Sequence, residues 1–130
     1  MRVLEANICK AIDQGRNLKS SNTEVYHTGN GGFVVKLYGH TIWQTDEQGK
    51  SCMFACGWET NTTKSRLNAL LEHLIGNTYV YQERHTWYVK VGRSLHKEPF
   101  YEGIELPLIN TSRPIFNSIR YLNKLVDAAR

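Results

Sequence analysis

The chain has 130 residues, 41% hydrophobic and 11% aromatic, which is enough for one domain with a core and excludes a disordered chain. Its formal net charge of +4 is mild, so it permits a nucleic-acid partner without requiring one. No apolar run approaches the roughly 18–20 residues that span a membrane, and charged residues interrupt the N-terminal apolar pattern, so we predict no signal peptide and a cytoplasmic protein.

The first half of the chain predicts one helix followed by strands. Apolar residues recur at helical spacing over residues 1–15, and Gly15 is a suitable stop. Four strands are then predicted from segments rich in β-branched and aromatic residues, at residues 23–27, 33–37, 41–45 and 51–56. The glycine-rich turn 29–32, the segment 38–40 and the polar turn 46–50 separate these strands, as hairpins require.

The second half predicts two more helices with strands between them. Apolar residues three and four positions apart from Leu67 to Ile75 indicate the central helix, which Gly76 ends. A second hairpin and one further short strand are predicted at residues 78–82, 86–91 and 103–106. Ser112, as the N-cap, precedes a last helix with a basic face.

This order of elements predicts an α+β fold, in which an antiparallel sheet built from hairpins carries helices packed on it. We predict a helix, four strands, a helix, two strands, one optional strand and a final helix. All of it forms a single domain over residues 1–130, divided into the N-terminal helix 1–15, the sheet and central helix 23–91, and an irregular segment with the basic helix 92–130.

Cysteine and histidine positions give no sign of catalysis or metal binding. Cys52 and Cys56 lie four apart on a predicted strand and so share a face; with Cys9 we interpret them as buried apolar thiols, because an odd number argues against a disulfide framework. The five histidines lie on separate elements without zinc-binding spacing. We therefore expect no catalytic residues, no metal, no cofactor and no enzymatic activity.

The main candidate site is the start of the central helix. Free N–H groups and the helix dipole make such a start suitable for an anion. Here it carries hydroxyl and basic side chains and one aromatic ring that could stack on a base: Trp58, Thr62, Thr63, Lys64, Ser65 and Arg66. The alternative is an ordinary helix cap, since Thr is a common N-cap and no P-loop spacing precedes Lys64.

A second candidate surface combines the second hairpin with the last helix. Aromatic and basic residues of these elements are candidates for contacting a partner: Tyr81, Arg84, Trp87, Arg113, Arg120 and Lys124. The alternative is that the aromatic residues fill a half-buried strand and the basic ones form the solvated face of an amphipathic helix.

Three segments of the chain resemble a recurrent set of small tailed-bacteriophage proteins of unassigned function. The resemblance rests on Ser21-Asn22-Thr23-x-Val25, on Val35-x-Leu37-x-Gly39-x-x-Ile42, and on Gly57-Trp58-x-Thr60-x-Thr62-Thr63-Lys64-Ser65-Arg66-Leu67-Asn68-Ala69-Leu70, and it covers residues 12 to 90. The chain departs from the set at His40, where Asn is typical, and in the tail after residue 92, which looks like an addition. The resemblance implies a phage setting but supplies no catalytic residues.

Small phage proteins commonly bind host machinery or block host defences, so the setting favours a binding function. We predict a non-enzymatic protein that binds a host bacterial protein or protein–nucleic-acid complex in the host cytoplasm, with no membrane contact, and inhibits or redirects it. The alternative is a phosphate-recognising binder of nucleic acid or of a signalling nucleotide, through the start of the central helix. The sequence leaves the oligomeric state open.

Overall fold

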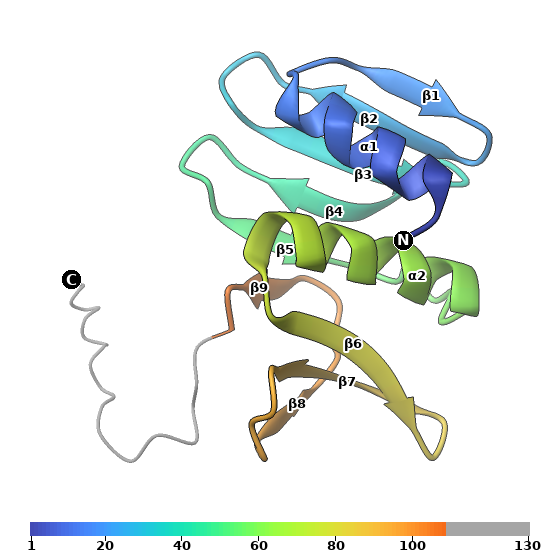
Figure 1. Ribbon diagram of the computed structural model, residues 1–130, viewed down its shortest axis with the longest axis vertical. Coiled ribbons are helices and arrows are strands. Elements are labelled where there is room, and N and C mark those ends of the chain that lie inside the picture. The colour runs from blue at the N-terminus through green and yellow to red at the C-terminus, as the bar shows by residue number, and fades with distance from the viewer. Residues whose placement is uncertain (109–130) are drawn as a thin grey trace.

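The computed structural model describes residues 1–108, in which two helices lie across one face of a six-stranded antiparallel sheet (Figure 1). The helices are α1 (Val3–Asp13) and α2 (Asn61–Leu70), the second continued by a π-helical turn (Leu71–Ile75). The strands lie in the order β1 (Leu18–Ser20), β2 (Thr23–His27), β3 (Phe33–Leu37), β4 (His40–Thr45), β5 (Ser51–Met53) and β9 (Ile104–Leu106). A separate three-stranded sheet contains β6 (Thr78–Glu83), β7 (Thr86–Val91) and β8 (Lys97–Pro99).

The core of the larger sheet is one row of buried side chains that crosses five strands. Strand registers place these residues directly beside one another: Val25, Val35, Trp43, Met53 and Ile104. All five are at most 1% exposed. Because side chains alternate between the two faces of a strand, this register turns the whole apolar set toward the helices.

The apolar stripe of the central helix packs against this row, as its periodicity predicts. Leu67, Leu70 and Leu71 are buried, whereas Leu74 is only partly buried at the end of the helix. Gly76 adopts a φ of 86° and donates its N–H to the Leu71 carbonyl at 2.7 Å, which closes the π-helical turn. The predicted stop at Gly76 is thereby confirmed.

The smaller sheet joins the same hydrophobic core through its inner face. Val80, Trp87 and Val89 belong to the core cluster. On the side of β6 away from β7, the Asn68 side chain of α2 donates to the Val80 carbonyl at 2.9 Å and accepts from the Val80 N–H at 2.6 Å. A side-chain amide therefore makes the two hydrogen bonds that a neighbouring strand would make at this residue.

The predicted α+β class is confirmed, with antiparallel strands and helices packed on a sheet. Two short strands, β1 and β8, were not predicted, and the strands form two sheets. Both missed strands have only three residues and carry exposed lysines, so neither shows an apolar alternation. The optional strand at residues 103–106 is present as β9.

Two predictions about cysteines are wrong. Strand β5 ends at Met53, and Cys56 lies in a following turn with a φ of 55°, so it does not share a strand face with Cys52. Cys9 is buried, but Cys52 is partly exposed and Cys56 is exposed. The predicted last helix lies outside the described residues, and so do Arg113, Arg120 and Lys124. No helix within residues 1–108 is long and apolar enough to cross a membrane.

Candidate functional site

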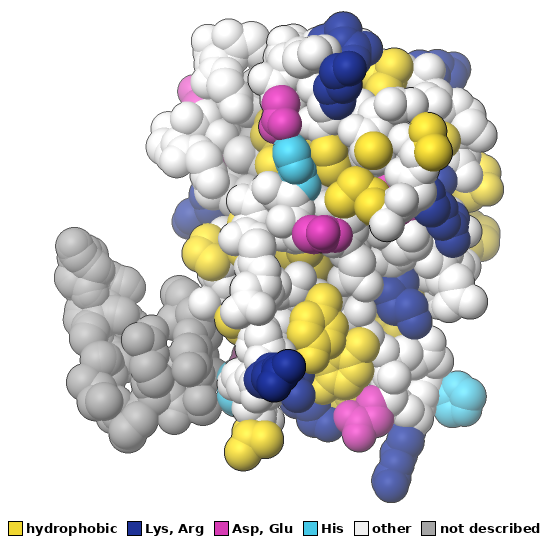
Figure 2. All heavy atoms as spheres, in the orientation of Figure 1, with side chains coloured by type: hydrophobic (Ala, Val, Ile, Leu, Met, Phe, Trp, Pro, Cys, Tyr) yellow, Lys and Arg dark blue, Asp and Glu magenta, His cyan; other side chains and the backbone are white. Residues whose placement is uncertain are grey.

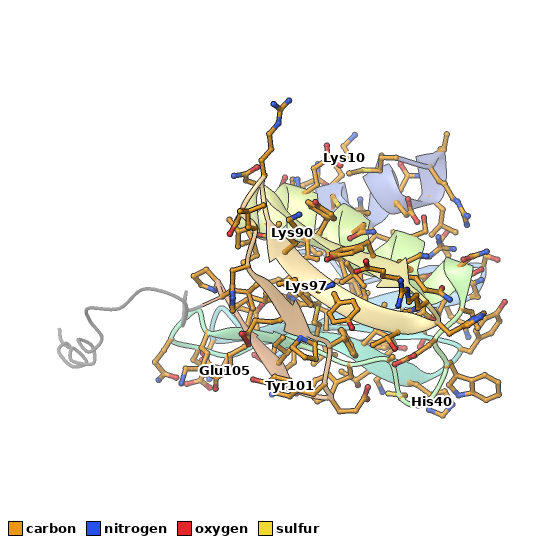
Figure 3. All side chains as sticks on the ribbon, turned by 90° about the horizontal axis from the view of Figure 1, so that it is seen from below. Lys10, His40, Lys90, Lys97, Tyr101 and Glu105 are labelled. Carbon is orange, nitrogen blue, oxygen red and sulfur yellow. The ribbon has the colours of Figure 1, made fainter. Side chains whose placement is uncertain are left out.

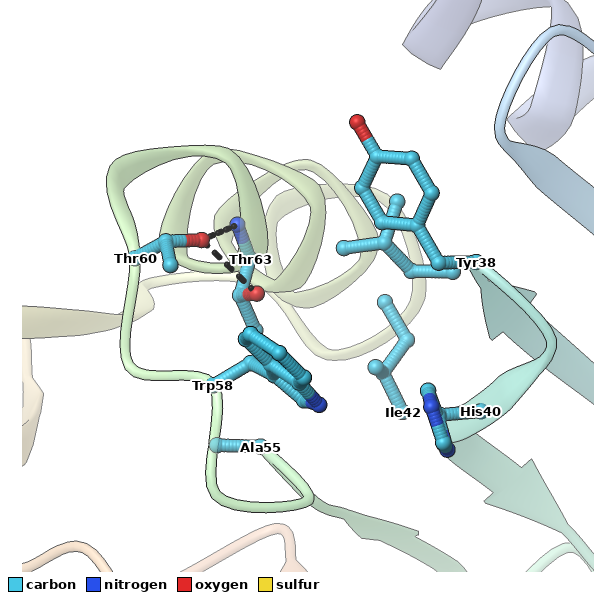
Figure 4. Close-up of a pocket in the computed structure, with 8 residues that line it drawn as sticks. Tyr38, His40, Ile42, Ala55, Trp58, Thr60 and Thr63 are labelled. Atoms are coloured by element: carbon cyan, nitrogen blue, oxygen red, sulfur yellow. Dashed lines mark hydrogen bonds between the residues drawn. The ribbon is translucent and has the colours of Figure 1, made fainter.

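An apolar cavity of about 280 Å³ opens beside the start of α2 (Figure 4). Three chain segments border it: the β3–β4 hairpin, the loop from β5 to α2, and the first turn of α2. Its lining residues are Leu37, Tyr38, His40, Ile42, Ala55, Trp58, Thr60 and Thr63. Tyr38 and Trp58 are 70% and 60% exposed, so two large aromatic residues border a hollow that remains open to solvent.

The first wall is the two-residue turn between β3 and β4. Tyr38 and Gly39 both have positive φ values, 52° and 81°, which is the backbone pattern of a type I′ hairpin turn. A bulky side chain adopts such a φ at a conformational cost, which surrounding contacts must offset. One of these is the hydrogen bond from the Tyr38 N–H to the Asn22 carbonyl at 2.8 Å. The turn thus holds the Tyr38 ring outward, at the edge of the cavity.

The second wall is the loop that carries Trp58. Its backbone is fixed by Glu102, whose carboxylate accepts hydrogen bonds from the N–H groups of Ala55 at 2.9 Å and Cys56 at 2.7 Å. The Trp58 N–H in turn donates to the Ala55 carbonyl at 2.9 Å. The loop is therefore tied to a segment 46 residues away in the sequence, and the exposed Trp58 ring stands on a fixed backbone.

The floor of the cavity meets the first turn of α2. Thr60 is the N-cap: its hydroxyl oxygen accepts the Thr63 N–H at 3.2 Å and lies 3.1 Å from the Thr63 hydroxyl. This bond satisfies one of the free N–H groups that begin every helix. The structure therefore confirms that a threonine caps this helix in the ordinary way.

Replacing Thr60 with alanine is expected to lower the free energy of unfolding by about 1 kcal/mol, because the Thr63 N–H loses its acceptor. Thr60→Ser retains the hydroxyl and should stay close to wild type. Urea unfolding monitored by circular dichroism measures both variants. Equal losses for the alanine and serine variants would show that the methyl group, and not the cap, stabilises this helix.

The basic and hydroxyl residues predicted to gather at the helix start do not all do so. Thr62 and Lys64 are partly exposed there, whereas Thr63 is buried. Arg66 was expected to project into solvent, and this is wrong, because its side chain is only 6% exposed. One helical turn beyond the N-cap, Ser65 and Arg66 both face α1 instead of the cavity.

These two residues belong to a buried polar network that joins α1, α2 and β2. The Glu5 carboxylate, 3% exposed, accepts hydrogen bonds from the Ser65 hydroxyl at 2.6 Å and from the Arg66 guanidinium at 2.7 Å. The remaining Arg66 nitrogens donate to the Thr23 hydroxyl at 3.0 Å and to the Asn22 side-chain oxygen at 3.2 Å. Four residues of the phage-protein resemblance thus belong to one network and have a structural role: Ser65 and Arg66 contact the carboxylate, and Asn22 and Thr23 contact Arg66.

The network sets the charge state of its acidic member. Burial by itself raises the pKa of Glu5, because it disfavours the charged form. Hydrogen bonds from Ser65, from the Arg2 N–H and from Arg66, together with the positive charge of Arg66, outweigh burial and hold the pKa of Glu5 below its ordinary value of 4.5. Glu5 is therefore an anion paired with the Arg66 cation at neutral pH.

The partner-contact residues predicted on the second hairpin divide into two groups. Trp87 is 3% exposed and packs edge-on against Phe100 at 5.5 Å, so its prediction as an anchor for a partner is wrong. Tyr81 is partly exposed on the outer face of the sheet, and Arg84 is exposed at the hairpin tip. Alternation along β7 turns Trp87 inward, which the pattern of apolar residues in this strand indicates.

Most residues of the site were not predicted as site residues. Tyr38 and His40 lie in the segment predicted to connect the strands at residues 33–37 and 41–45, but no local signal indicated that this connection borders a cavity. Glu102 had no local signal either, because its partners lie in a distant loop. Among residues 1–108, no group of three or more His, Cys, Asp or Glu side chains is placed to hold a metal ion.

A protein-family model described as Kyanoviridae Gp96 protein matches residues 1–107. The chain belongs to the Kyanoviridae Gp96 family. This family consists of phage proteins, so the predicted phage setting is confirmed. The Gp96 match includes the segments before residue 12 and from 92 to 107, so residues 92–107 are not an addition, contrary to expectation. No curated protein and no solved structure matches the chain.

Proposed function

We propose that this phage protein binds a host bacterial protein stoichiometrically and inhibits or redirects it, and that the cavity beside α2 receives an apolar side chain of that host protein. The observation that carries the proposal is the exposed pair Tyr38 and Trp58 bordering an apolar hollow. Tyrosine and tryptophan are enriched among the few residues that dominate the binding energy of protein interfaces.

The cavity has room for one large apolar side chain. At about 280 Å³ it lies at the small end of the volumes of about 300–1,000 Å³ that hold drug-sized ligands and cofactors. Its walls are fixed by backbone hydrogen bonds from Tyr38 and to Glu102, so little ordering is required when a partner binds.

The alternative function, phosphate recognition at the start of α2, has less support. Two of its predicted contact groups, Ser65 and Arg66, are held by Glu5. Thr62 and Lys64 remain partly exposed at the helix start. A phosphate ligand there would have one lysine and no arginine, which is weaker than the clustered basic residues of phosphate sites.

The proposal is tested by tagged pull-down from host bacteria that express the protein, followed by affinity measurement with the recovered protein. Wild type is expected to recover one host protein at near-stoichiometric yield. Trp58→Ala should weaken binding by about 30-fold or more, the loss of about 2 kcal/mol that defines a dominant interface residue. Tyr38→Ala should weaken it as well.

Tyr101→Ala is the matched control for Tyr38→Ala, because Tyr101 is 57% exposed and does not line the cavity. It should bind like wild type. Recovery of no specific host protein, or unchanged affinity in Trp58→Ala, would overturn the proposal. If the variants lose binding to a nucleotide or an oligonucleotide and no host protein is recovered, phosphate recognition is the better description.

A further inference from the structure

The outer face of the smaller sheet carries three neighbouring tyrosine rings. Val80, Trp87 and Val89 fill the core side, so alternation turns Tyr79, Tyr81 and Tyr88 to the opposite side. The ring centroids of Tyr79 and Tyr81 are 5.7 Å apart, and those of Tyr81 and Tyr88 are 5.8 Å apart. Hydrophobic side chains, a class that includes tyrosine, gather over these strands with Lys and Arg beside them (Figure 2).

Basic side chains lie beside these rings. The Lys97 ammonium lies 4.3 Å from the centroid of the Tyr88 ring, a cation–π contact. Lys90 of β7 and Lys97 of β8 are direct partners in the strand register (Figure 3). Arg84 at the tip of the β6–β7 hairpin and Arg93 after β7 are both exposed. The tyrosine rings therefore share their face with Lys90 and Lys97, and one exposed arginine lies in the turn at each end of β7.

The pairing of Lys90 with Lys97 is unfavourable within the protein itself. Like charges placed directly opposite each other destabilise an antiparallel pair. Glu83 relieves Lys97, with its carboxylate 2.6 Å from the ammonium, but within residues 1–108 Lys90 has no ion pair. A bound anion at this face would remove the repulsion, since it would neutralise the unpaired Lys90.

We propose that the outer face of β6, β7 and β8 binds a single strand of nucleic acid. The bases stack on Tyr79, Tyr81 and Tyr88, and Lys90, Arg84 and Arg93 contact the phosphates. Aromatic rings on an exposed sheet bind unpaired bases regardless of sequence, because every base has a flat face. Duplex is excluded, since its bases are already stacked on one another. This face is separate from the cavity beside α2 and independent of the host-protein proposal.

Charge distinguishes this partner from an acidic protein surface. The only carboxylate among the outward-facing residues of β6 and β7 is that of Glu83, and it is occupied by Lys97. Three flat rings that share one face with cationic side chains match a strand that presents unpaired bases and phosphates together.

The test is fluorescence anisotropy with the full chain and labelled oligonucleotides of about 12 nucleotides, within the site sizes known for single-strand binders. Single-stranded DNA, single-stranded RNA and duplex DNA are titrated at two salt concentrations. Either single strand is expected to bind more tightly than duplex, with affinity falling as salt rises because phosphate contacts release counterions. The comparison of the DNA and RNA arms identifies which nucleic acid is preferred.

Two matched pairs of variants distinguish binding at this face from nonspecific attraction to the positive charge of the protein. Lys90→Ala should weaken binding and reduce the salt slope by about one, whereas Lys10→Ala removes the same charge from the exposed side of α1 and should have little effect (Figure 3). Tyr81→Ala should weaken binding by about 5-fold or more, and Tyr81→Phe, which retains the ring, should not.

If Tyr81→Ala fails to fold, as judged by its thermal melt, Tyr79→Ala replaces it, because Tyr79 is more exposed. Absence of single-strand binding at low salt would overturn the proposal. Equal losses for Lys90→Ala and Lys10→Ala would do so too. Loss of host-protein capture in Tyr79→Ala without any change in oligonucleotide binding would show that the face contacts protein instead.

Discussion

Replacing Glu5 with glutamine is expected to lower the free energy of unfolding by about 3–5 kcal/mol, because it leaves the buried Arg66 guanidinium without its counter-charge. Domains of this size are stable by only about 5–15 kcal/mol, so the variant will be close to unfolding at room temperature. Guanidinium chloride unfolding monitored by tryptophan fluorescence measures the change.

The matched control for Glu5→Gln is Glu105→Gln, which makes the same substitution in an exposed ion pair. Glu105 lies 3.6 Å from Lys50, and both side chains are about 60% exposed. Solvent screens such pairs, so this variant should lose less than about 1 kcal/mol. Similar losses in the two variants would contradict a structural role for the buried network.

The effect of Glu5→Gln depends on pH in a defined direction. Because the native pKa of Glu5 lies below its ordinary value of 4.5, its contribution to stability is fully present above pH 4.5. That contribution is lost as pH falls from 4.5 through the lowered native pKa, where protonated glutamic acid resembles glutamine. Unfolding curves from pH 7 to pH 3 should therefore show the gap between wild type and variant narrowing.

The buried network also limits how phosphate recognition at α2 is tested. Reversing Arg66 to glutamate would bring two carboxylates together in the core and unfold the chain, whether or not a ligand binds. A test of phosphate recognition should instead reverse the charge of Lys64, because Lys64 is partly exposed and lies outside the network.

Truncation of Leu70 or Leu71 to alanine is expected to cost about 2–5 kcal/mol, the range observed when a buried leucine is removed and its cavity only partly closes. The two residues are 2% and 0% exposed, and they pack against the row of buried sheet residues that begins with Val25. Leu95→Ala is the matched control: Leu95 is 97% exposed, and its truncation should change stability by at most about 0.5 kcal/mol. A loss below about 1 kcal/mol for Leu70→Ala, measured by urea unfolding, would contradict the packing of α2.

Local periodicity explains which parts of the fold could be predicted. Strands Thr23–His27 and Phe33–Leu37 have the predicted bounds, and the leucine stripe of α2 is buried, because burial of an apolar face determines both patterns. The exposed strands β1 and β8 lack such a pattern. They depend on their neighbours β2 and β7, and a short window of sequence does not contain that information.

The candidate site was only partly predictable for a related reason. Trp58 and the Thr60 cap are signalled locally, by an aromatic residue and a threonine ahead of a helix. The direction of Arg66 depends on Glu5, 61 residues away, and no local pattern indicates whether a basic residue faces solvent or a buried carboxylate. Arginine at a helix start is usually solvated, and this is why sequence reasoning placed it in the wrong environment.

The hydrogen bonds of Asn68 protect one edge of the smaller sheet from pairing with other molecules of the protein. An unpaired strand edge is a template on which other chains add and aggregation begins. At β6 the Asn68 amide already bonds both backbone groups of Val80, and α2 lies along this edge. A second molecule would have to displace a helix before it could extend the smaller sheet here. Through a single side chain, the fold thus hinders fibre-like self-association at this edge of the smaller sheet.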